Sequence, residues 1–339
     1  MRATFFVLVH QPGSGYNAPL VVPKGFLNYE IGANQGRVMQ TSTRRQLIRK
    51  GMMVAESKMF QEDKIWSRYS NDKVDIGETL ARVTRTLHKT LPLDNALSAL
   101  SIGSSNEPQF RLLETAFRSG LYLLDIEQEA LQVVRERILR QRTNHVYTIA
   151  GDFREILSDS HSSQQFVSSA LGGSRMELVT LHHSLYYCEA NRWLSLFSNL
   201  LRHVLFERGA IHAVLMAPDN SEFGTTGWLY EHFASRFFGH HNEQDLQVLG
   251  GQIRAAEEAA DCQVLMKQSR IHFSADDFEK FMAVVWMILL YPSVHPYSEE
   301  QRREITTFMM DEFWAKQRPL WQLQDHLVIY RGIPFPGLI

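Results

Sequence analysis

The chain has 339 residues, of which 44% are hydrophobic and 21% are charged, a balance that suits one large α/β domain or two modest domains. Its formal net charge of −2 provides no general basic field, so we expect no nucleic-acid partner and no membrane partner. Cys188 and Cys262 give neither a disulfide framework nor a metal-ligand spacing, and we expect a cytoplasmic, reducing location. The apolar runs 5–9 and 281–291 are too short for a signal-peptide core and a membrane span.

The first 92 residues are predicted to form a segment separate from the rest of the chain. Residues 1–40 hold a short β-like run and turns rich in Gly, Pro and Asn, and they indicate no role. Apolar residues at helical spacing predict helices over 43–60 and 75–90, and Pro92 ends the second one.

From residue 93 to residue 339, strands and helices alternate. Seven strands are predicted, at 97–102, 121–125, 145–149, 176–182, 209–216, 262–273 and 326–331. Helices are predicted at 108–118, 127–141, 190–206, 226–238, 243–259, 275–290 and 298–316, with helical insertions at about 220–320. The Ser- and Gly-rich stretch 158–175 is predicted as a surface excursion. This alternation predicts an α/β, Rossmann-like, mostly parallel sheet with helices on both faces.

The stretch from Leu97 to Glu107 carries the strongest functional signal. An apolar strand stops at Gly103, small residues come next, and the second predicted strand ends in Asp125. A strand, a tight turn, a helix and a second strand ending in a carboxylate are typical of a nucleoside site, where the carboxylate accepts hydrogen bonds from the ribose hydroxyls. The later glycines of the dinucleotide fingerprint are missing, which argues against NAD or FAD and favours a ligand without phosphates.

The third and fourth predicted strands also end in polar residues. Asp152 follows the third strand and would bind an adenine amino group, or else cap a short helix that begins at Phe153. The fourth strand ends in a His pair, a Ser and a Tyr pair over 182–187. We interpret His182 as a backbone contact to the cofactor and His183 as either a base or a structural hydrogen-bonding residue.

These motifs together resemble the class I S-adenosylmethionine-dependent methyltransferases, and 182–187 is most similar to the histamine N-methyltransferase type. The resemblance covers about residues 95–220. It implies an antiparallel last strand, a helical lid formed by the N-terminal segment, and S-adenosylmethionine as cofactor. The cofactor-binding residues that it implies are Gly103, Ser104, Ser105, Glu107, Asp125, Ile126, Asp152, Phe153 and His182.

The same resemblance implies that His183 and Tyr187 face the methyl acceptor as the catalytic pair. Further acceptor-binding candidates are Trp66, Tyr69, Tyr186, Asp325 and His326, although Trp66 and Tyr69 lie three residues apart and would equally suit helix packing. No metal site is expected, because His240 and His241 lack partners at ligand spacing.

The resulting hypothesis is an enzyme that transfers a methyl group to nitrogen or oxygen of a small molecule by in-line displacement. Two alternatives stay open: a catalytically silent methyltransferase-like partner subunit, and a different nucleoside-binding enzyme such as an oxidoreductase. Ser105 stands where the methyltransferase motif usually has glycine, which keeps the silent alternative open. The sequence specifies neither the acceptor molecule nor its reacting atom, and oligomerisation stays open.

Overall fold

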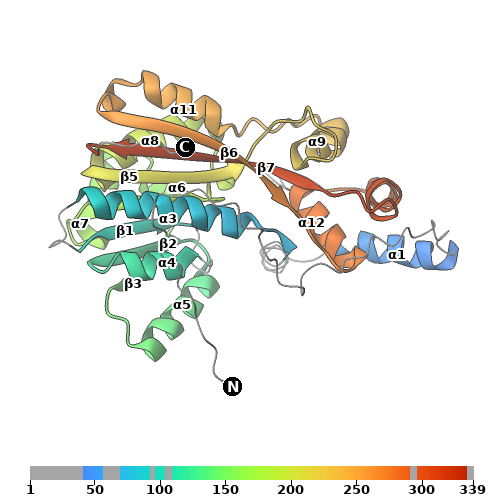
Figure 1. Ribbon diagram of the computed structural model, residues 1–339, viewed down its shortest axis with the longest axis horizontal. Helices are drawn as coiled ribbons and strands as arrows, with labels where there is room; N and C mark the ends of the chain where they lie inside the picture. The colour runs from blue at the N-terminus through green and yellow to red at the C-terminus, as the bar shows by residue number, and fades with distance from the viewer. Residues whose placement is uncertain (1–40, 56–68, 92–95, 104–108, 291–295, 334–339) are drawn as a thin grey trace, which may run out of the picture.

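The computed structural model describes residues 41–55, 69–91, 96–103, 109–290 and 296–333 (Figure 1). Its centre is a seven-stranded sheet in the order β3-β2-β1-β4-β5-β7-β6. In chain order the strands are β1 Ser98–Ile102, β2 Gly120–Asp125, β3 Val146–Ala150, β4 Met176–His182, β5 Leu205–Met216, β6 Cys262–His272 and β7 Trp321–Arg331. Neighbouring strands are parallel except where β7 pairs with β5 and β6. The predicted Rossmann-like sheet with an antiparallel last strand is therefore confirmed.

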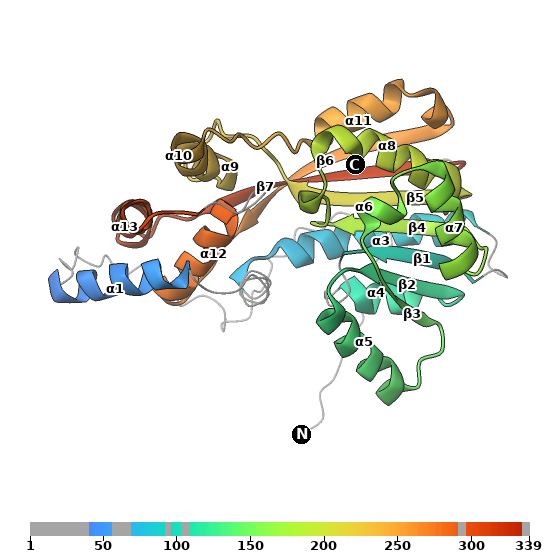
Figure 2. The same cartoon turned by 180° about the vertical axis from the view of Figure 1, so that it is seen from behind.

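Helices cover both faces of the sheet, as Figures 1 and 2 show from opposite sides. One face is covered by α3 Asp72–Thr90, α4 Gln109–Ala116 and α5 Gln128–Gln141. The other face is covered by α6 Phe153–Ile156, α7 Ser160–Ala170, α8 Trp193–Asn199 and α11 Leu246–Ala255. Successive strand residues point to opposite faces, so the strands supply side chains to two separate cores.

A third core lies beyond the sheet and belongs to the two insertions. Between β5 and α11 the chain forms α9 Thr226–Tyr230, a π-helical segment Glu231–Ser235 and α10 Arg236–Phe238. Between β6 and β7 it forms α12 Phe278–Leu290, α13 Glu299–Phe308 and a π-helical segment Met309–Trp314. These helices share a buried, aromatic-rich cluster against which α1 Thr41–Val54 packs (Figure 1). The predicted helical insertions are thus present.

The predicted surface excursion over 158–175 is wrong, because most of it is the helix α7. Asp159 caps this helix by accepting a hydrogen bond from the Ser162 N–H at 2.8 Å. Phe166 is buried in the core on that face of the sheet. Serine lowers helix propensity only weakly, and one buried aromatic with a good N-cap outweighs it.

The N-terminal segment contributes to two different cores. Residues 1–40 lie outside the described part of the chain, α1 packs on the insertion helices, and α3 packs directly on the sheet. The division of the chain at residues 92 and 93 and the lid role stay predictions. None of the helices in the described residues is long and apolar enough to cross a membrane.

Candidate functional site

The strand order reverses its direction of growth between β1 and β4, and ligands of open α/β sheets bind at the carboxyl edge of such a switch point. Gly103 sits at this point, directly after β1, with a φ of 71° that favours glycine. Its N–H donates to the Leu124 carbonyl at 2.8 Å. A Cβ on Gly103 would lie 2.6 Å from the Ser184 Cβ, so the turn after β1 and the loop after β4 are packed against each other.

Two carboxylates follow β2 and β3 at the same edge. Asp125 ends β2, is half-buried, and accepts a hydrogen bond from the Glu127 N–H at 2.9 Å. Ile126, next to it, is largely exposed. The Gly151 N–H donates to the Asp125 carbonyl, which sets the chain segment before Asp152 beside the end of β2. The structure therefore brings Gly103, Asp125 and Asp152 to one edge, as the sequence predicted.

Asp152 is both a helix cap and one member of an ion pair. Its carboxylate accepts hydrogen bonds from the Arg154 N–H at 2.9 Å and from the Arg154 guanidinium at 2.5–3.0 Å. The Arg154 hydrogen bond holds the pKa of Asp152 below its usual value. Phe153 is buried in the core rather than presented to a ligand. An adenine amino group could reach this carboxylate only by sharing it with Arg154.

Arg154 also connects this carboxylate to the loop after β4. Its guanidinium donates to the Tyr187 carbonyl at 3.0 Å, and its own carbonyl accepts from Arg192 at 3.2 Å. A pocket of about 300 Å³ opens here, lined by Asp152, Arg154, Glu155, Ser158 and Arg192. The residues around the adenine position predicted from sequence therefore line a pocket that includes two arginines.

His183 lies beside a buried carboxylate that the sequence analysis did not predict. Its Nε2 is 3.6 Å from Asp72 Oδ2, at the first turn of α3, and its ring stacks on Tyr186 with 5.8 Å between centroids. His183 has a φ of 56°, a conformation that a non-glycine residue adopts rarely and that is common at functional sites. Lys73 Nζ lies 3.6 Å from the same carboxylate oxygen. The carboxylate thus lies beside the His183 ring nitrogen, at a distance longer than a hydrogen bond.

Burial alone would raise the pKa of Asp72, but its interactions with His183 and the charge of Lys73 outweigh burial and hold the pKa well below its usual range. Asp72 is therefore ionised at neutral pH. Its position in the first turn of α3 also favours a negative charge, because the helix dipole is positive there.

The two tyrosines after β4 differ in environment. The Tyr186 hydroxyl accepts from the Met216 N–H at 2.8 Å and its ring is held under His183, so it links β4 to β5. Burial raises the pKa of Tyr186 well above its usual value. Tyr187 is about half exposed and is the more accessible ring.

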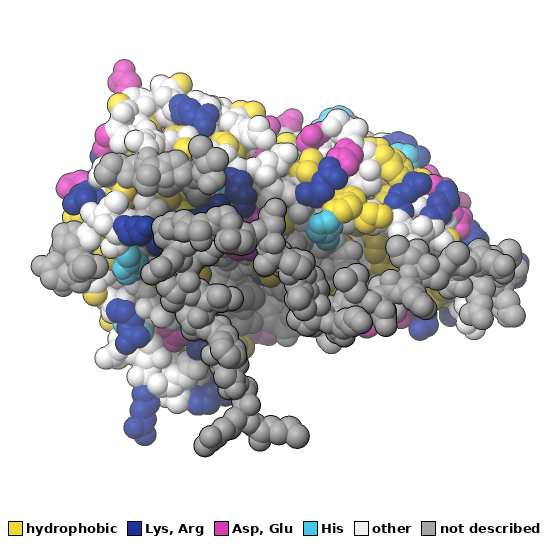
Figure 3. All heavy atoms as spheres, in the orientation of Figure 1, with side chains coloured by type: hydrophobic (Ala, Val, Ile, Leu, Met, Phe, Trp, Pro, Cys, Tyr) yellow, Lys and Arg dark blue, Asp and Glu magenta, His cyan; other side chains and the backbone are white. Residues whose placement is uncertain are grey.

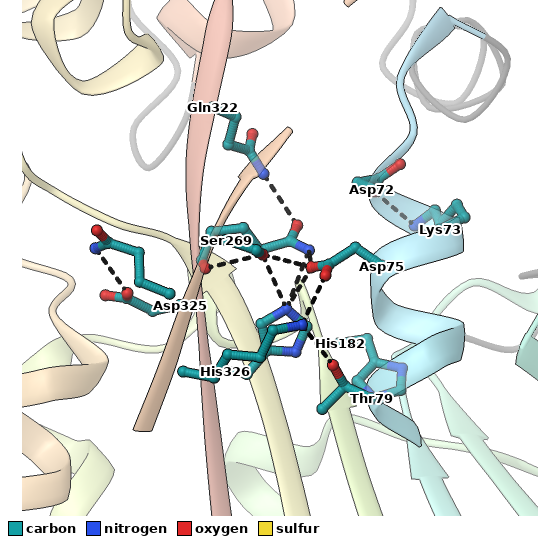
Figure 4. A network of polar contacts seen from close by, with 12 residues as sticks. Asp72, Lys73, Asp75, Thr79, His182, Ser269, Gln322, Asp325 and His326 are labelled. Carbon is teal, nitrogen blue, oxygen red and sulfur yellow. Dashed lines mark hydrogen bonds and ion pairs between the residues drawn. The ribbon is translucent and has the colours of Figure 1, made fainter. Parts of the chain in front are cut away.

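His182 and His326 belong to a buried row of hydrogen-bonded side chains, His182, His212, His326 and Asp75, which we call the histidine file. His182 Nε2 lies 3.1 Å from His212 Nδ1, His212 Nε2 lies 3.1 Å from His326 Nδ1, and His326 Nε2 lies 2.6 Å from Asp75 Oδ2. Figure 4 shows Asp75 of α3 directed at His326 and Ser269. The prediction that His182 serves only through its backbone therefore omits a side chain with a long hydrogen-bonded connection.

Asp325 and His326 point to opposite faces of β7, so the structure does not bring these two acceptor candidates together. Asp325 accepts from Gln268 at 2.9 Å and Gln247 at 3.4 Å, on the face covered by α11. Burial raises its pKa above the usual value.

Several predicted residues cannot be placed. Trp66, Ser104, Ser105 and Glu107 lie outside the described residues. Tyr69 is half-buried and Lys280 lies over its ring at 5.5 Å, which corresponds to the packing alternative. Among the residues that the structure describes, no group of three or more His, Cys, Asp or Glu has metal-binding geometry.

The sequence analysis missed Asp72, Lys73, Asp75 and His212. One signal was available for the acids: Asp72 and Asp75 are three residues apart and therefore share a helical face that also carries apolar residues. A charge on a buried helical face must be paired, so it points to a site. His212, inside an otherwise apolar strand, was the matching signal on the sheet.

Comparisons with known proteins add little beyond the fold. No protein-family model matches the chain, and no curated protein sequence matches it. Among solved structures, a protein named "putative methyltransferase" from Bacillus halodurans C-125 has 14% identity and a TM-score of 0.46 over 73% of this chain and 98% of its own. The plantazolicin methyltransferase BpumL, solved with SAH, has 14% identity and a TM-score of 0.42 over 86% and 98%.

The cyclase SpnF has 12% identity and a TM-score of 0.39 over 75% of this chain and 81% of its own. At this level of similarity no activity is carried over, and the fold assignment stands on the strand order and strand directions. None of these three proteins is named a histamine N-methyltransferase, and that type stays a prediction from the fourth-strand motif.

Substituting Gly103→Ala should destabilise the protein and weaken any ligand bound at the switch point, because the new Cβ would meet Ser184 at 2.6 Å. The left-handed backbone adds strain of about 1 kcal/mol. Urea unfolding measures the loss. The double variant Gly103→Ala/Ser184→Gly should recover part of it, and equal stability of Gly103→Ala and the wild type would contradict the packing described.

The lowered pKa of Asp72 predicts a pH-dependent contribution to stability. Because the folded-state pKa lies below the unfolded value of about 4, the contribution is present above that value and is lost as the pH falls below it. The difference in unfolding free energy between wild type and Asp72→Asn should therefore shrink from pH 7 to pH 3. A difference that stays constant over this range would show that the carboxylate is not selectively stabilised in its charged form.

Proposed function

We propose that the protein is an S-adenosylmethionine-dependent methyltransferase that methylates nitrogen or oxygen of a small-molecule acceptor. One observation carries the proposal: the switch point between β1 and β4 places the Gly103 turn, the Asp125 carboxylate and a pair of histidines at one edge. This edge is where open α/β sheets bind nucleosides.

The residues present fit an adenosyl ligand without phosphates. A side chain at Gly103 would collide with the loop after β4, so glycine is what lets this turn pack against that loop at the edge where the ligand would bind. Asp125 is partly accessible at the end of its strand and suits ribose hydroxyls. When bound, S-adenosylmethionine would supply a methyl group already activated by a positively charged sulfur.

The chain's own residues then have to align the acceptor and manage its protons, because methyl transfer needs an in-line approach and little further activation. His183, held against Asp72 and stacked on Tyr186, is the proposed base that frees the acceptor's lone pair. Asp72, 3.6 Å from the ring nitrogen, is the proposed positioning residue, in the place that the carboxylate takes in Asp–His pairs. Tyr187, exposed beside it, is the proposed acceptor contact.

The distribution of charge supports a small-molecule acceptor. On the face drawn in Figure 3, basic and acidic side chains are interspersed over the described surface. Several exposed arginines lie within 4 Å of a carboxylate, among them Arg202 with Glu258 and Arg236 with Glu304. Such paired charges do not provide the continuous positive surface that a nucleic-acid acceptor requires.

The Arg154–Asp152 ion pair is the observation that favours the silent alternative, because it engages the carboxylate proposed for adenine. Binding measurements separate the two functions, since a silent partner subunit without a cofactor site would not recognise S-adenosylhomocysteine.

Titration calorimetry with S-adenosylhomocysteine should give micromolar binding to the wild-type protein and at least about tenfold weaker binding to Asp125→Ala, which loses charge-assisted hydrogen bonds to the ribose. Asp276→Ala, an exposed carboxylate on a different element, is the matched control and should bind like wild type. Absence of binding to the wild type would overturn the cofactor assignment.

His183→Ala should lower methyl transfer by about 10²- to 10⁴-fold, the usual contribution of a general base, while S-adenosylhomocysteine affinity changes little. The assay follows label from methyl-labelled S-adenosylmethionine into a panel of small amines and alcohols. Activity that survives unchanged in His183→Ala at neutral and at lower pH would remove His183 from the role of base.

A further inference from the structure

The buried histidine file crosses three neighbouring strands beneath the candidate site. His182 is the last residue of β4, His212 lies in β5 and His326 lies in β7, and all three side chains are at most 1% exposed. The file ends at Asp75 of α3, which packs on this face of the sheet (Figure 4). Apolar residues could be buried at these positions at a lower cost in free energy, because buried polar groups are destabilising unless each one is hydrogen-bonded.

The direction of every hydrogen bond in the file follows from its carboxylate end. Ionised Asp75 only accepts, so His326 Nε2 must carry the hydrogen. Burial lowers the pKa of His326, so the ring is neutral at pH 7 and its Nδ1 carries a lone pair. His326 Nδ1 then accepts from His212 Nε2–H, and His212 Nδ1 accepts from His182 Nε2–H. All three rings are thereby neutral Nε2–H tautomers, and His182 Nδ1 is left with its lone pair.

Asp75 is held in its charged form by the groups around it. Lys267 Nζ lies 2.8 Å from one oxygen, while Ser269 Oγ and Gln324 Nε2 donate to the other at 2.5 and 3.0 Å. Burial alone would raise the pKa of Asp75, but these hydrogen bonds and that of His326 outweigh it and hold the pKa well below its usual range. The orientation of the file is therefore fixed at neutral pH.

At its opposite end the file stops at an unpaired acceptor. His182 Nδ1 is buried and has no hydrogen-bond partner among the described residues. His183, the next residue, and Lys73 of α3 are the charged or titratable groups that influence it from the site side. Asp72 Oδ2, a buried oxygen 3.6 Å from both His183 Nε2 and Lys73 Nζ, accepts no hydrogen bond from the described residues. An unpaired acceptor on His182 and a carboxylate oxygen beside the next residue, His183, suit a ligand that presents N–H donors, such as an amine.

We propose that the His182–His212–His326–Asp75 file is a proton relay that stores a proton released by an amine acceptor during methyl transfer. The inference rests on the proposed methyltransferase function. An amine that enters as an ammonium ion gives up two protons, one before its nitrogen attacks the methyl carbon and one after. His183 takes the first, and the file takes the second.

The second proton moves by bond exchange along the file. After the N–CH₃ bond forms and the S–CH₃ bond breaks, an N–H bond of the methylated ammonium breaks and its proton binds His182 Nδ1. The Nε2 proton of His182 passes to His212 Nδ1, and the Nε2 proton of His212 passes to His326 Nδ1. The positive charge then lies briefly on His326, where Asp75 offsets part of the burial that lowers the pKa of the ring. The sequence runs backward to water after the product leaves.

Nitrogen-15 histidine NMR tests the relay without any acceptor. The wild-type spectrum should show three neutral Nε2–H tautomers for His182, His212 and His326. In Asp75→Asn the amide oxygen replaces Oδ2 as acceptor, so the tautomers should persist. In Asp75→Ala the carboxylate acceptor is gone. Ser269 Oγ and Gln324 Nε2, which lie 3.4 and 3.5 Å from His326 Nε2, then donate to it. All three rings, including His182, should therefore change to the Nδ1–H tautomer.

Two results would overturn the relay: an Nδ1–H tautomer of His182 in the wild type, or a His182 tautomer that is the same in Asp75→Ala as in the wild type. If Asp75→Ala does not fold, His212→Phe tests the same hydrogen-bonded row by removing the acceptor of His182 Nε2–H. His182 should then lose its strongly hydrogen-bonded proton signal, and an unchanged His182 spectrum counts against the proposal.

Turnover gives a second readout with the panel of amines and methyl-labelled S-adenosylmethionine. His212→Phe should slow methyl transfer by about tenfold or more while S-adenosylhomocysteine affinity stays the same. His203→Phe, a buried histidine outside the file, is the matched control and should keep the wild-type rate. Equal rates for His212→Phe and wild type overturn the relay. If the wild type binds no S-adenosylhomocysteine, the proposed function is overturned instead. The NMR spectra still decide whether the histidine file has the proposed order of hydrogen bonds.

Discussion

The close packing of the turn after β1 against the loop after β4 determines where this protein can bind a ligand. Gly103 adopts a positive φ there and leaves no room for a Cβ beside Ser184. Because the strand order reverses at this place, the ends of β1, β2, β3 and β4 meet around it. The carboxylate of Asp125, the Asp152–Arg154 pair and the two histidines 182 and 183 are brought together by that arrangement.

A second constraint is set by the polar and charged side chains that are buried beneath this edge. The first turns of α3 bring Asp72 and Asp75 onto a sheet face that elsewhere packs leucine, valine and phenylalanine. Charges in such a place are stable only when each is paired, and the pairing here extends from His183 on one side to Lys267 on the other. A fold that needed only stability would use apolar side chains in these positions, so the polar contacts indicate chemistry at this edge.

The sequence predicted the alternation of strands and helices well because parallel strands buried on both faces are continuous apolar runs, and Gly103, Asp125 and Asp152 stand directly where those runs end. It failed where tertiary packing outweighs composition, as in the Ser-rich helix α7 that Phe166 anchors. It also failed where function depends on pairs far apart in the chain. Nothing local links Asp72 to His183 or Asp75 to His326, and only the fold brings them close together.

The central claim is that the carboxyl edge at Gly103 and Asp125 holds an adenosyl ligand without phosphates. A crystal structure of the full chain grown with S-adenosylhomocysteine tests this most directly. The account predicts the ribose hydroxyls on the Asp125 carboxylate and the methionine portion against the backbone at Gly103. Density for the ligand at another place, with Asp125 engaged only in contacts within the protein, would contradict it.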